Sequence, residues 1–170
     1  MTTQTDVIDQ PVRVIAVQTG KYLTFSLNRE EYGIGILIVK EIIGMMPITS
    51  VPKTTEFVKG VINLRGKVIP VVDLRLKFIM DAIPYSERTC IIVVEIEAES
   101  GTILIGIVVD AVSEVLNIKE EETEETPAFG TSLNTEFILG MAKIEGVVKI
   151  LLDINKVLSV SEISALKNAS

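Results

Sequence analysis

The stretch GVINLRGKVIPVVDL (residues 60–74) has the pattern of a β-hairpin followed by a helical turn. Gly66 stands at the turn, where a positive φ costs least for glycine, and Asp73 can cap the backbone that follows the second strand. The stretch GMAKIEGVVKILLDI (residues 140–154) aligns with it without gaps at a shift of 80 positions. The chain therefore contains one hairpin unit twice.

A second pair of blocks extends this duplication. GIGILIVKEI (residues 33–42) matches GIVVDAVSEV (residues 106–115) at a shift of 73 positions. Because the two shifts differ, the second half carries a net insertion, which we place in the polar stretch 119–134. We expect two small barrels, barrel 1 over residues 19–86 and barrel 2 over residues 87–157, that share apolar surface and leave a groove between them.

The hydrophobic pattern predicts an all-β fold. YLTFSL (residues 22–27) alternates apolar and polar side chains, which is the period of a half-buried strand. Similar short stretches separated by turns favour barrels or sandwiches; they span residues 61–64, 67–72, 89–96, 102–109, 138–144 and 147–152. Helix signals are limited to residues 52–58 and 160–166. We expect an N-terminal tail at 1–18, one domain over 19–160, and a C-terminal helix or tail at 158–170.

Composition narrows the class of function. The net charge of -7 opposes nucleic-acid binding. Apolar runs are too short to span a bilayer, no signal sequence is evident, and Cys90 has no partner for an internal disulfide, so we expect a cytoplasmic protein. The chain has no histidine, and neither GxGxxG nor GxxxxGK[ST] occurs. We predict a binding module, with no catalytic residue, metal ligand or cofactor.

Two charged residues are candidates for an interaction site. Arg65 lies beside the first hairpin turn, where its guanidinium can offer a rigid fork to a carboxylate of a partner or of this chain. The second copy has Glu145 there, and an exposed turn arginine without a function explains Arg65 equally well. Glu41 interrupts the apolar stretch 36–43, and its simplest interpretation is an outward-facing charge on a half-buried segment.

The same segments resemble the CheW-type coupling proteins of bacterial chemotaxis from about residue 21 to residue 157. The matching motifs, in order, are EYGI (31–34), VKEI (39–42), FVKGVINLRG (57–66), IPVVDLRLKF (69–78), GIVVDAVSEVL (106–116) and ILLDI (150–154). The resemblance implies two five-stranded SH3-like barrels packed on a shared apolar core. It also implies a chemotaxis adaptor, or scaffold, that couples chemoreceptor tips to the regulatory domain of the histidine kinase CheA, and that is recruited from the cytoplasm to membrane-associated receptor arrays.

The resemblance also assigns roles to residues. The family's receptor groove lies between the barrels and takes a helical hairpin, and by motif position Val39, Val112 and Val115 line it. From the residues alone these valines are expected in the core. Glu41 and Arg65 match residues tied to receptor or kinase coupling. Two alternatives stay open: a small-molecule-binding regulatory β-barrel that uses the groove, and an enzyme that works with carboxylates alone.

Overall fold

The computed structural model describes residues 20–52, 54–98, 101–124 and 137–158. Short strands dominate this part of the chain, as the sequence predicts. In chain order, the elements are β1 (Gly20–Leu27), β2 (Glu30–Gly35), η1 (Ile36–Ile38), β3 (Val39–Gly44), β4 (Val58–Leu64), β5 (Lys67–Asp73), α3 (Leu74–Lys77), β6 (Cys90–Ala98), β7 (Gly101–Val109), β8 (Ala111–Ile118), η2 (Glu120–Glu122), β9 (Thr123–Glu124), β10 (Ile138–Ile144), β11 (Val147–Leu152) and α4 (Ile154–Val157).

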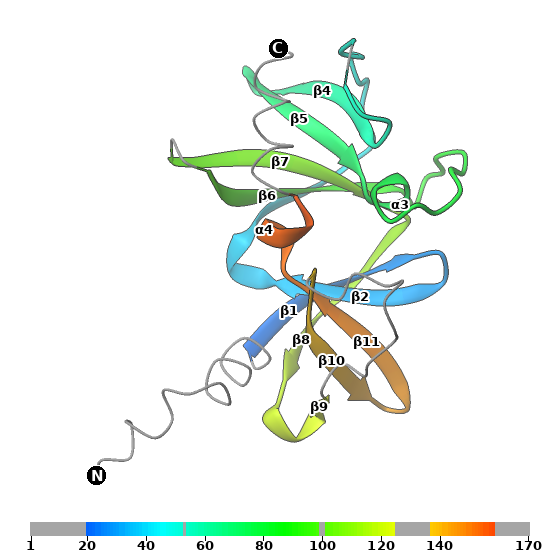
Figure 1. The fold of residues 1–170 in the computed structure, drawn as a ribbon, viewed down its shortest axis with the longest axis vertical. Coiled ribbons are helices and arrows are strands. Elements are labelled where there is room, and N and C mark those ends of the chain that lie inside the picture. Colours follow the sequence, from blue (N-terminus) through cyan, green and yellow to red (C-terminus); the bar gives the residue numbers. More distant parts are fainter. Residues whose placement is uncertain (1–19, 53, 99–100, 125–136, 159–170) are drawn as a thin grey trace.

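The strands form two sheets. One has five strands in the order β3-β6-β7-β5-β4, and the other has six in the order β8-β1-β2-β11-β10-β9. Figure 1 shows the five-stranded sheet in the upper half of the molecule, the six-stranded sheet in the lower half, and α4 between them. We call the units built on them the five-stranded barrel and the six-stranded barrel. The all-β prediction with a few short helices is confirmed.

The duplicated hairpins have the same turn. Arg65 and Gly66 have φ of 52° and 88°, and Glu145 and Gly146 have φ of 52° and 82°. Two successive left-handed residues define the type I′ turn, whose twist suits a two-residue hairpin. Leu64 then pairs directly with Lys67 across the turn.

Each hairpin ends in the predicted cap. The Asp73 carboxylate accepts hydrogen bonds from the backbone N–H of Arg75 at 2.9 Å and of Leu76 at 3.4 Å. The Asp153 carboxylate accepts one from the N–H of Asn155 at 3.1 Å. These bonds satisfy N–H groups that a short helix leaves without an intrahelical partner.

The strands do not follow the predicted barrel boundary at residues 86 and 87. Both sheets combine strands from the two sides of it, because β5 pairs in parallel with β7, and β11 pairs in parallel with β2. Glycines lie at both parallel pairings: a Cβ added to Gly106 would lie 2.7 Å from Ile91 Cγ2, and one added to Gly33 would lie 3.1 Å from Leu151 Cδ2. The two copies thus exchange their β1–β2 and β6–β7 hairpins, which corrects the prediction of one barrel per half of the chain.

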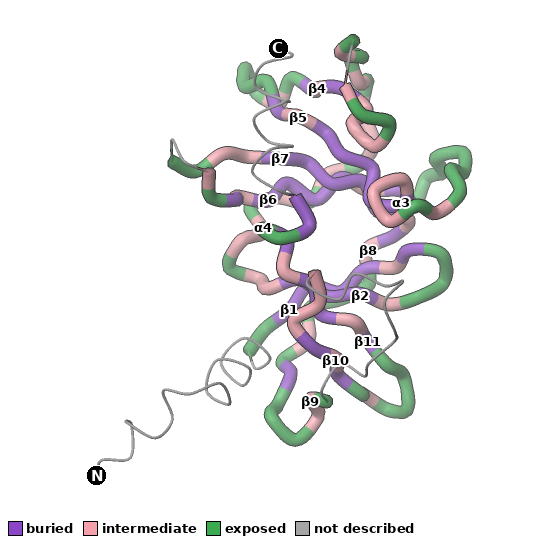
Figure 2. Tube along the Cα trace, in the orientation of Figure 1, coloured by how far each residue is buried: buried purple, intermediate pink, exposed green. Residues whose placement is uncertain are grey.

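The largest apolar cluster joins the two barrels. Phe25 and Ile34 of the six-stranded sheet lie in it together with Ile92 and Ile107 of the five-stranded sheet, all less than 1% exposed. Val157 of α4 completes it from the side. A smaller cluster fills each barrel by itself, and Figure 2 shows the buried segments running through both sheets. The expectation of a shared apolar core is confirmed.

Some predicted elements differ or lie outside the described residues. Residues 54–57 form no helix, and β4 begins at Val58, so the predicted helix at 52–58 is wrong. This segment forms a turn that leads into β4, in which the Val58 N–H donates a hydrogen bond to the Thr55 carbonyl oxygen at 3.1 Å. The N-terminal tail, the predicted helix at 160–166 and most of the 119–134 stretch lie outside the described residues.

Candidate functional site

An exposed ion pair joins the first hairpin turn to β3. Arg65 Nη1 donates a hydrogen bond to Glu41 Oε2 at 3.0 Å, and Arg65 Nη2 donates to Glu41 Oε1. The side chain of Arg65 is 69% exposed and that of Glu41 is 31% exposed. The fork geometry expected of the arginine is therefore realised toward a carboxylate of this chain, 24 residues away.

The pair changes the acidity of both groups. The hydrogen bond from Arg65, together with its charge, lowers the pKa of Glu41 below its ordinary value. The same hydrogen bond and the carboxylate charge raise the pKa of Arg65. Both shifts favour the charged forms, so the two side chains remain an ion pair at neutral pH.

A second ion pair lies on the same face of the five-stranded barrel. Lys40 Nζ is 2.9 Å from Glu95 Oε1. Hydrogen bonds from Lys40 and Thr102 lower the pKa of Glu95, which keeps this carboxylate ionised as well. Both pairs line one cavity of about 550 Å³ whose walls include the apolar side chains of Ile69, Val93 and Leu104. No local sequence pattern indicates this cavity, because its lining comes from five strands and the β4–β5 turn.

The three predicted valines do not share one environment. Val39 and Val112 are half-buried and pack against the cluster between the barrels. They occupy equivalent strand positions, where Val39 lies opposite Val94 and Val112 lies opposite Phe25. Val115 is 51% exposed on β8. The expectation that these valines lie in the core thus holds in part for Val39 and Val112, which are half-buried. Val115 is instead an apolar side chain on the surface.

A partly buried ion pair that the sequence did not predict connects the two barrels. Arg75 Nη1 donates to Asp110 Oδ2 at 2.6 Å, and the side chains are 9% and 22% exposed. The same oxygen accepts from the backbone N–H of Asn28 at 2.8 Å. Asp110 lies between β7 and β8, so one carboxylate connects α3, the crossover between the sheets and the β1–β2 turn. Both residues lie in family motifs, but their pairing across 35 positions is not readable from either motif.

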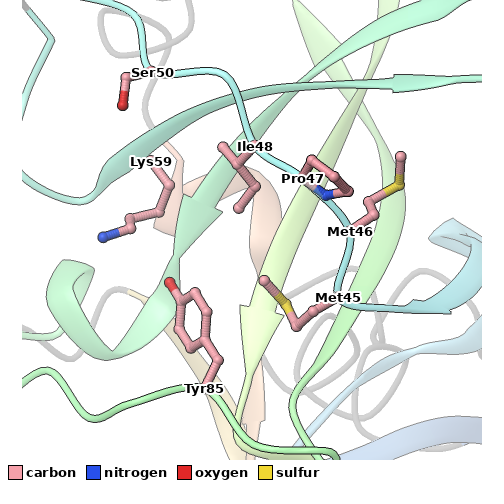
Figure 3. Close-up of a pocket in the computed structure, with 7 residues that line it drawn as sticks. All are labelled: Met45, Met46, Pro47, Ile48, Ser50, Lys59 and Tyr85. Carbon is pink, nitrogen blue, oxygen red and sulfur yellow. The ribbon is translucent and has the colours of Figure 1, made fainter.

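A second cavity of about 550 Å³ lies where the chain runs from β3 to β4 (Figure 3). Met45, Met46 and Ile48 give it an apolar lining, and Ser50, Lys59 and Tyr85 contribute polar groups. The Tyr85 hydroxyl donates to Asp73 Oδ2 at 2.8 Å. Burial, followed by this hydrogen bond, raises the pKa of Tyr85, so the hydroxyl serves as a donor and not as a base.

Two kinds of feature are absent from the part of the chain that the structure describes. No group of three or more cysteine, aspartate or glutamate side chains in residues 20–52, 54–98, 101–124 and 137–158 is arranged to hold a metal ion. Within the same ranges, no helix has both the length and the apolar character needed to cross a membrane.

Comparison with known proteins gives one consistent result. The family model for the CheW-like domain matches residues 21–162. The chemotaxis protein CheW of Klebsiella aerogenes is 41% identical over 150 residues, which cover 88% of each chain, and that of Bacillus subtilis is 34% identical over 134 residues, which cover 78% of this chain and 80% of the relative.

A solved structure agrees with these sequence matches. The crystal structure of the scaffolding protein TtCheW from Thermoanaerobacter tengcongensis superposes with a TM-score of 0.72 at 37% identity, and covers 85% of this chain and 95% of that one. The family model, the relatives and the fold all lead to one assignment. The chain belongs to the CheW family of chemotaxis proteins.

Proposed function

We propose that this chain is a chemotaxis scaffold that couples chemoreceptor tips to the regulatory domain of the histidine kinase CheA. The observation that carries the proposal is the match to CheW proteins over residues 21–162, together with the resemblance of its fold to a protein described as a scaffold. The chain contributes binding surfaces and no chemistry. It acts in the cytoplasm and joins receptor arrays at the membrane through its partners.

Coupling requires two surfaces that can be occupied together. Two partners held by one chain meet at a raised effective concentration, and a scaffold that binds one state of a partner more tightly also shifts that partner's equilibrium. Val39 and Val112, which pack at the junction between the barrels, and the exposed Val115 of β8 are proposed for the receptor. Glu41 and Arg65, on the five-stranded barrel, are proposed for coupling to the receptor or to the kinase.

A complex of three components tests this proposal. Purified chain, kinase regulatory domain and receptor cytoplasmic fragment are mixed and separated by size-exclusion chromatography with light scattering. We expect a species that contains all three, and no stable complex of receptor fragment and regulatory domain when the chain is left out. Elution of the chain alone, at concentrations above those of a working array, would contradict the proposal.

Recruitment to the membrane is tested separately by sedimentation with vesicles. The chain should sediment with vesicles that carry receptors and remain in the supernatant with receptor-free vesicles of the same lipids. Equal sedimentation with both kinds of vesicle would show direct lipid binding and contradict recruitment through a receptor.

A further inference from the structure

The cavity beside the connection from β3 to β4 has an apolar side and a polar side. We call it the methionine cavity, and the residues that define it are Met45, Met46, Ile48, Ser50, Lys59 and Tyr85. In Figure 3 the two methionines lie on one side of it, and the Ser50 hydroxyl and the Lys59 amine lie on the other. Its volume of about 550 Å³ is within the usual range of small-ligand pockets, about 300–1,000 Å³. The cavity thus has the size and polarity of a site for a small amphipathic molecule.

The chain segment that carries the methionines is fixed to the barrel. Met45 and Met46 directly follow β3, which ends at Gly44. Shortly after them, Thr49 and Val61 of β4 exchange two backbone hydrogen bonds, of 2.8 and 2.9 Å. Gly60 permits this close approach, because a Cβ at that position would collide with the Thr49 carbonyl oxygen. The segment is therefore held at both ends, and the cavity is formed without a ligand, as is usual for small-molecule sites.

Lys59 brings a positive charge to this cavity without a carboxylate to balance it. Among the residues that the structure describes, none forms an ion pair or a hydrogen bond with its amine. The other large cavity differs in this respect, since Lys40 and Arg65 in its lining are each paired with a glutamate. An anion that enters the methionine cavity therefore meets a cation that the fold has not already neutralised.

The internal duplication shows that a barrel does not need a lysine at this position. Lys59 is the second residue of β4, and at the shift of 80 it corresponds to Leu139, the second residue of β10. Leu139 packs against the apolar cluster inside the six-stranded barrel, and both residues are half-buried. An apolar side chain thus satisfies the packing of this strand position. The charge of Lys59 has no counterpart in the other copy, and a ligand accounts for it.

The polar side of the cavity is arranged to donate hydrogen bonds to an anion. The Tyr85 hydroxyl already donates to Asp73 Oδ2 at 2.8 Å, and Asp73 Oδ1 accepts the α3 cap bond from the N–H of Arg75. Tyr85 can therefore only accept a further hydrogen bond. Ser50 and Lys59 remain as the side-chain donors in the lining, and a carboxylate can accept from both at once.

We propose that the methionine cavity binds a medium-chain fatty acid, with its carboxylate at Lys59 and Ser50 and its alkyl chain against the two methionines. The carboxylate supplies the negative charge that Lys59 lacks. Methionine side chains are unbranched and polarizable, so they adapt to a flexible alkyl chain. None of the five residues proposed for coupling to the receptor or the kinase lines this cavity. The site therefore gives the scaffold a ligand that is independent of its protein partners.

Methionine methyl resonances report on the site directly. Of the five methionines in the chain, Met45 and Met46 line the cavity and Met141 lies on β10 of the other barrel. Decanoate is added, below its critical micelle concentration, to the intact chain labelled with ¹³C at the methionine methyl groups. The Met45 and Met46 resonances, assigned with the variants Met45→Leu and Met46→Leu, should shift to a saturating value while that of Met141 stays in place. No shift of either resonance, or an equal shift of Met141, would overturn the proposal.

Replacement of Lys59 tests the role of the charge. Lys59→Leu introduces the residue that the equivalent position of β10 already holds, so the barrel should remain folded. Its affinity for decanoate should fall at least about tenfold, the usual effect of losing a hydrogen bond to a charged group. Its affinity for decanol, which has the same chain without the charge, should not fall. Lys59→Arg should retain decanoate binding, and Lys143→Leu, the matched change on the exposed surface of β10, should bind as the wild type does.

Two results of this comparison would contradict the proposal. Equal affinity of the wild type and Lys59→Leu for decanoate would show that the lysine does not bind the carboxylate. Shifts of the Met45 and Met46 resonances on addition of the kinase regulatory domain or the receptor fragment, with none on addition of decanoate, would assign the cavity to a protein partner instead.

Discussion

Arg65 and Glu145 occupy the same turn position with the same φ of 52°, and the Arg65 side chain bonds to the Glu41 carboxylate. The turn itself therefore accepts either residue. What distinguishes the first copy is the exposed ion pair with Glu41, which costs the fold little to lose because exposed pairs contribute little stability. An effect of Arg65 on function can thus be separated from an effect on folding.

Charge reversal at Arg65 is the first prediction. Arg65→Glu should abolish kinase activation in a reconstituted receptor and kinase assay, because it places two carboxylates side by side at the edge of the cavity that Glu41 and Arg65 line. The thermal unfolding midpoint should stay close to that of the wild type. Glu145→Arg is the matched control at the equivalent turn and should leave activation intact. Full activation by a folded Arg65→Glu variant would count against the role of this residue.

The acidity of Glu41 gives a second prediction. The hydrogen bond from Arg65 lowers the pKa of Glu41 below the ordinary carboxyl pKa of 4.5. The ion pair therefore stabilises the fold fully at pH values above 4.5, and this stabilisation is lost as the pH falls through the lowered pKa. In Arg65→Gln, the pKa of Glu41 should rise toward 4.5. NMR titration of the side-chain carboxyl resonance measures both values, and identical titration in the two proteins would show that the ion pair does not persist in solution.

At the scale of elements, the two caps are equivalent in sequence but differ in their surroundings. Asp73 is 4% exposed and accepts a third hydrogen bond from the Tyr85 hydroxyl. Asp153 is half-buried, and its carboxylate accepts the cap bond from the N–H of Asn155. Removal of the Asp73 carboxylate therefore leaves more hydrogen-bond donors without an acceptor than removal of the Asp153 carboxylate does.

This difference sets the third prediction. Asp73→Ala should lower the free energy of unfolding by about 1–2 kcal/mol, and Asp153→Ala by about 0.5–1 kcal/mol, as judged from the usual cost of losing an N-cap. Urea denaturation of the two variants measures the difference directly. A larger loss for Asp153→Ala would show that the hydrogen bond from Tyr85 does not stabilise the fold.

The hairpins and their caps were predictable because they are local. A glycine at the turn and an aspartate after the second strand act within a few residues, so GVINLRGKVIPVVDL predicts both features. In the parallel pairing of β5 with β7, Val71 lies opposite Gly106. No local sequence pattern predicts which strand will pair with the free edge of another strand. The predicted helix at 52–58 failed for a related reason: Thr49 bonds to Val61 on β4, which holds the intervening segment as a loop.

The candidate site shows the same limit. Arg65 and Glu41 were recognised by motif position, and the fork geometry of arginine predicted a carboxylate partner. Their contact with each other required the folded barrel. The Arg75–Asp110 pair was missed, because two unremarkable charges in separate motifs become a buried connection between barrels only when the sheets pack.

At the scale of the whole molecule, the exchanged hairpins make the two halves of the chain interdependent. Each sheet takes strands from both halves, so neither half alone can complete a barrel. The cluster between the barrels also draws on both sheets.

The fourth prediction follows from this exchange. Fragments of residues 20–86 and 87–158, produced separately, should lack cooperative unfolding and dispersed NMR spectra, because each leaves strand edges and half of the core exposed. Mixed in equal amounts they should assemble into a folded complex that resembles the intact chain. Cooperative unfolding of either fragment alone would contradict the exchanged arrangement.

The most direct test of the central claim is kinase autophosphorylation in receptor-containing membranes, titrated with this chain. If the chain couples receptor to kinase, activity should rise as it is added and fall again when excess chain occupies receptors and kinases separately, and removal of the receptor should abolish the stimulation. Kinase activity that does not respond to the chain at any concentration, with both partners present, would contradict the account.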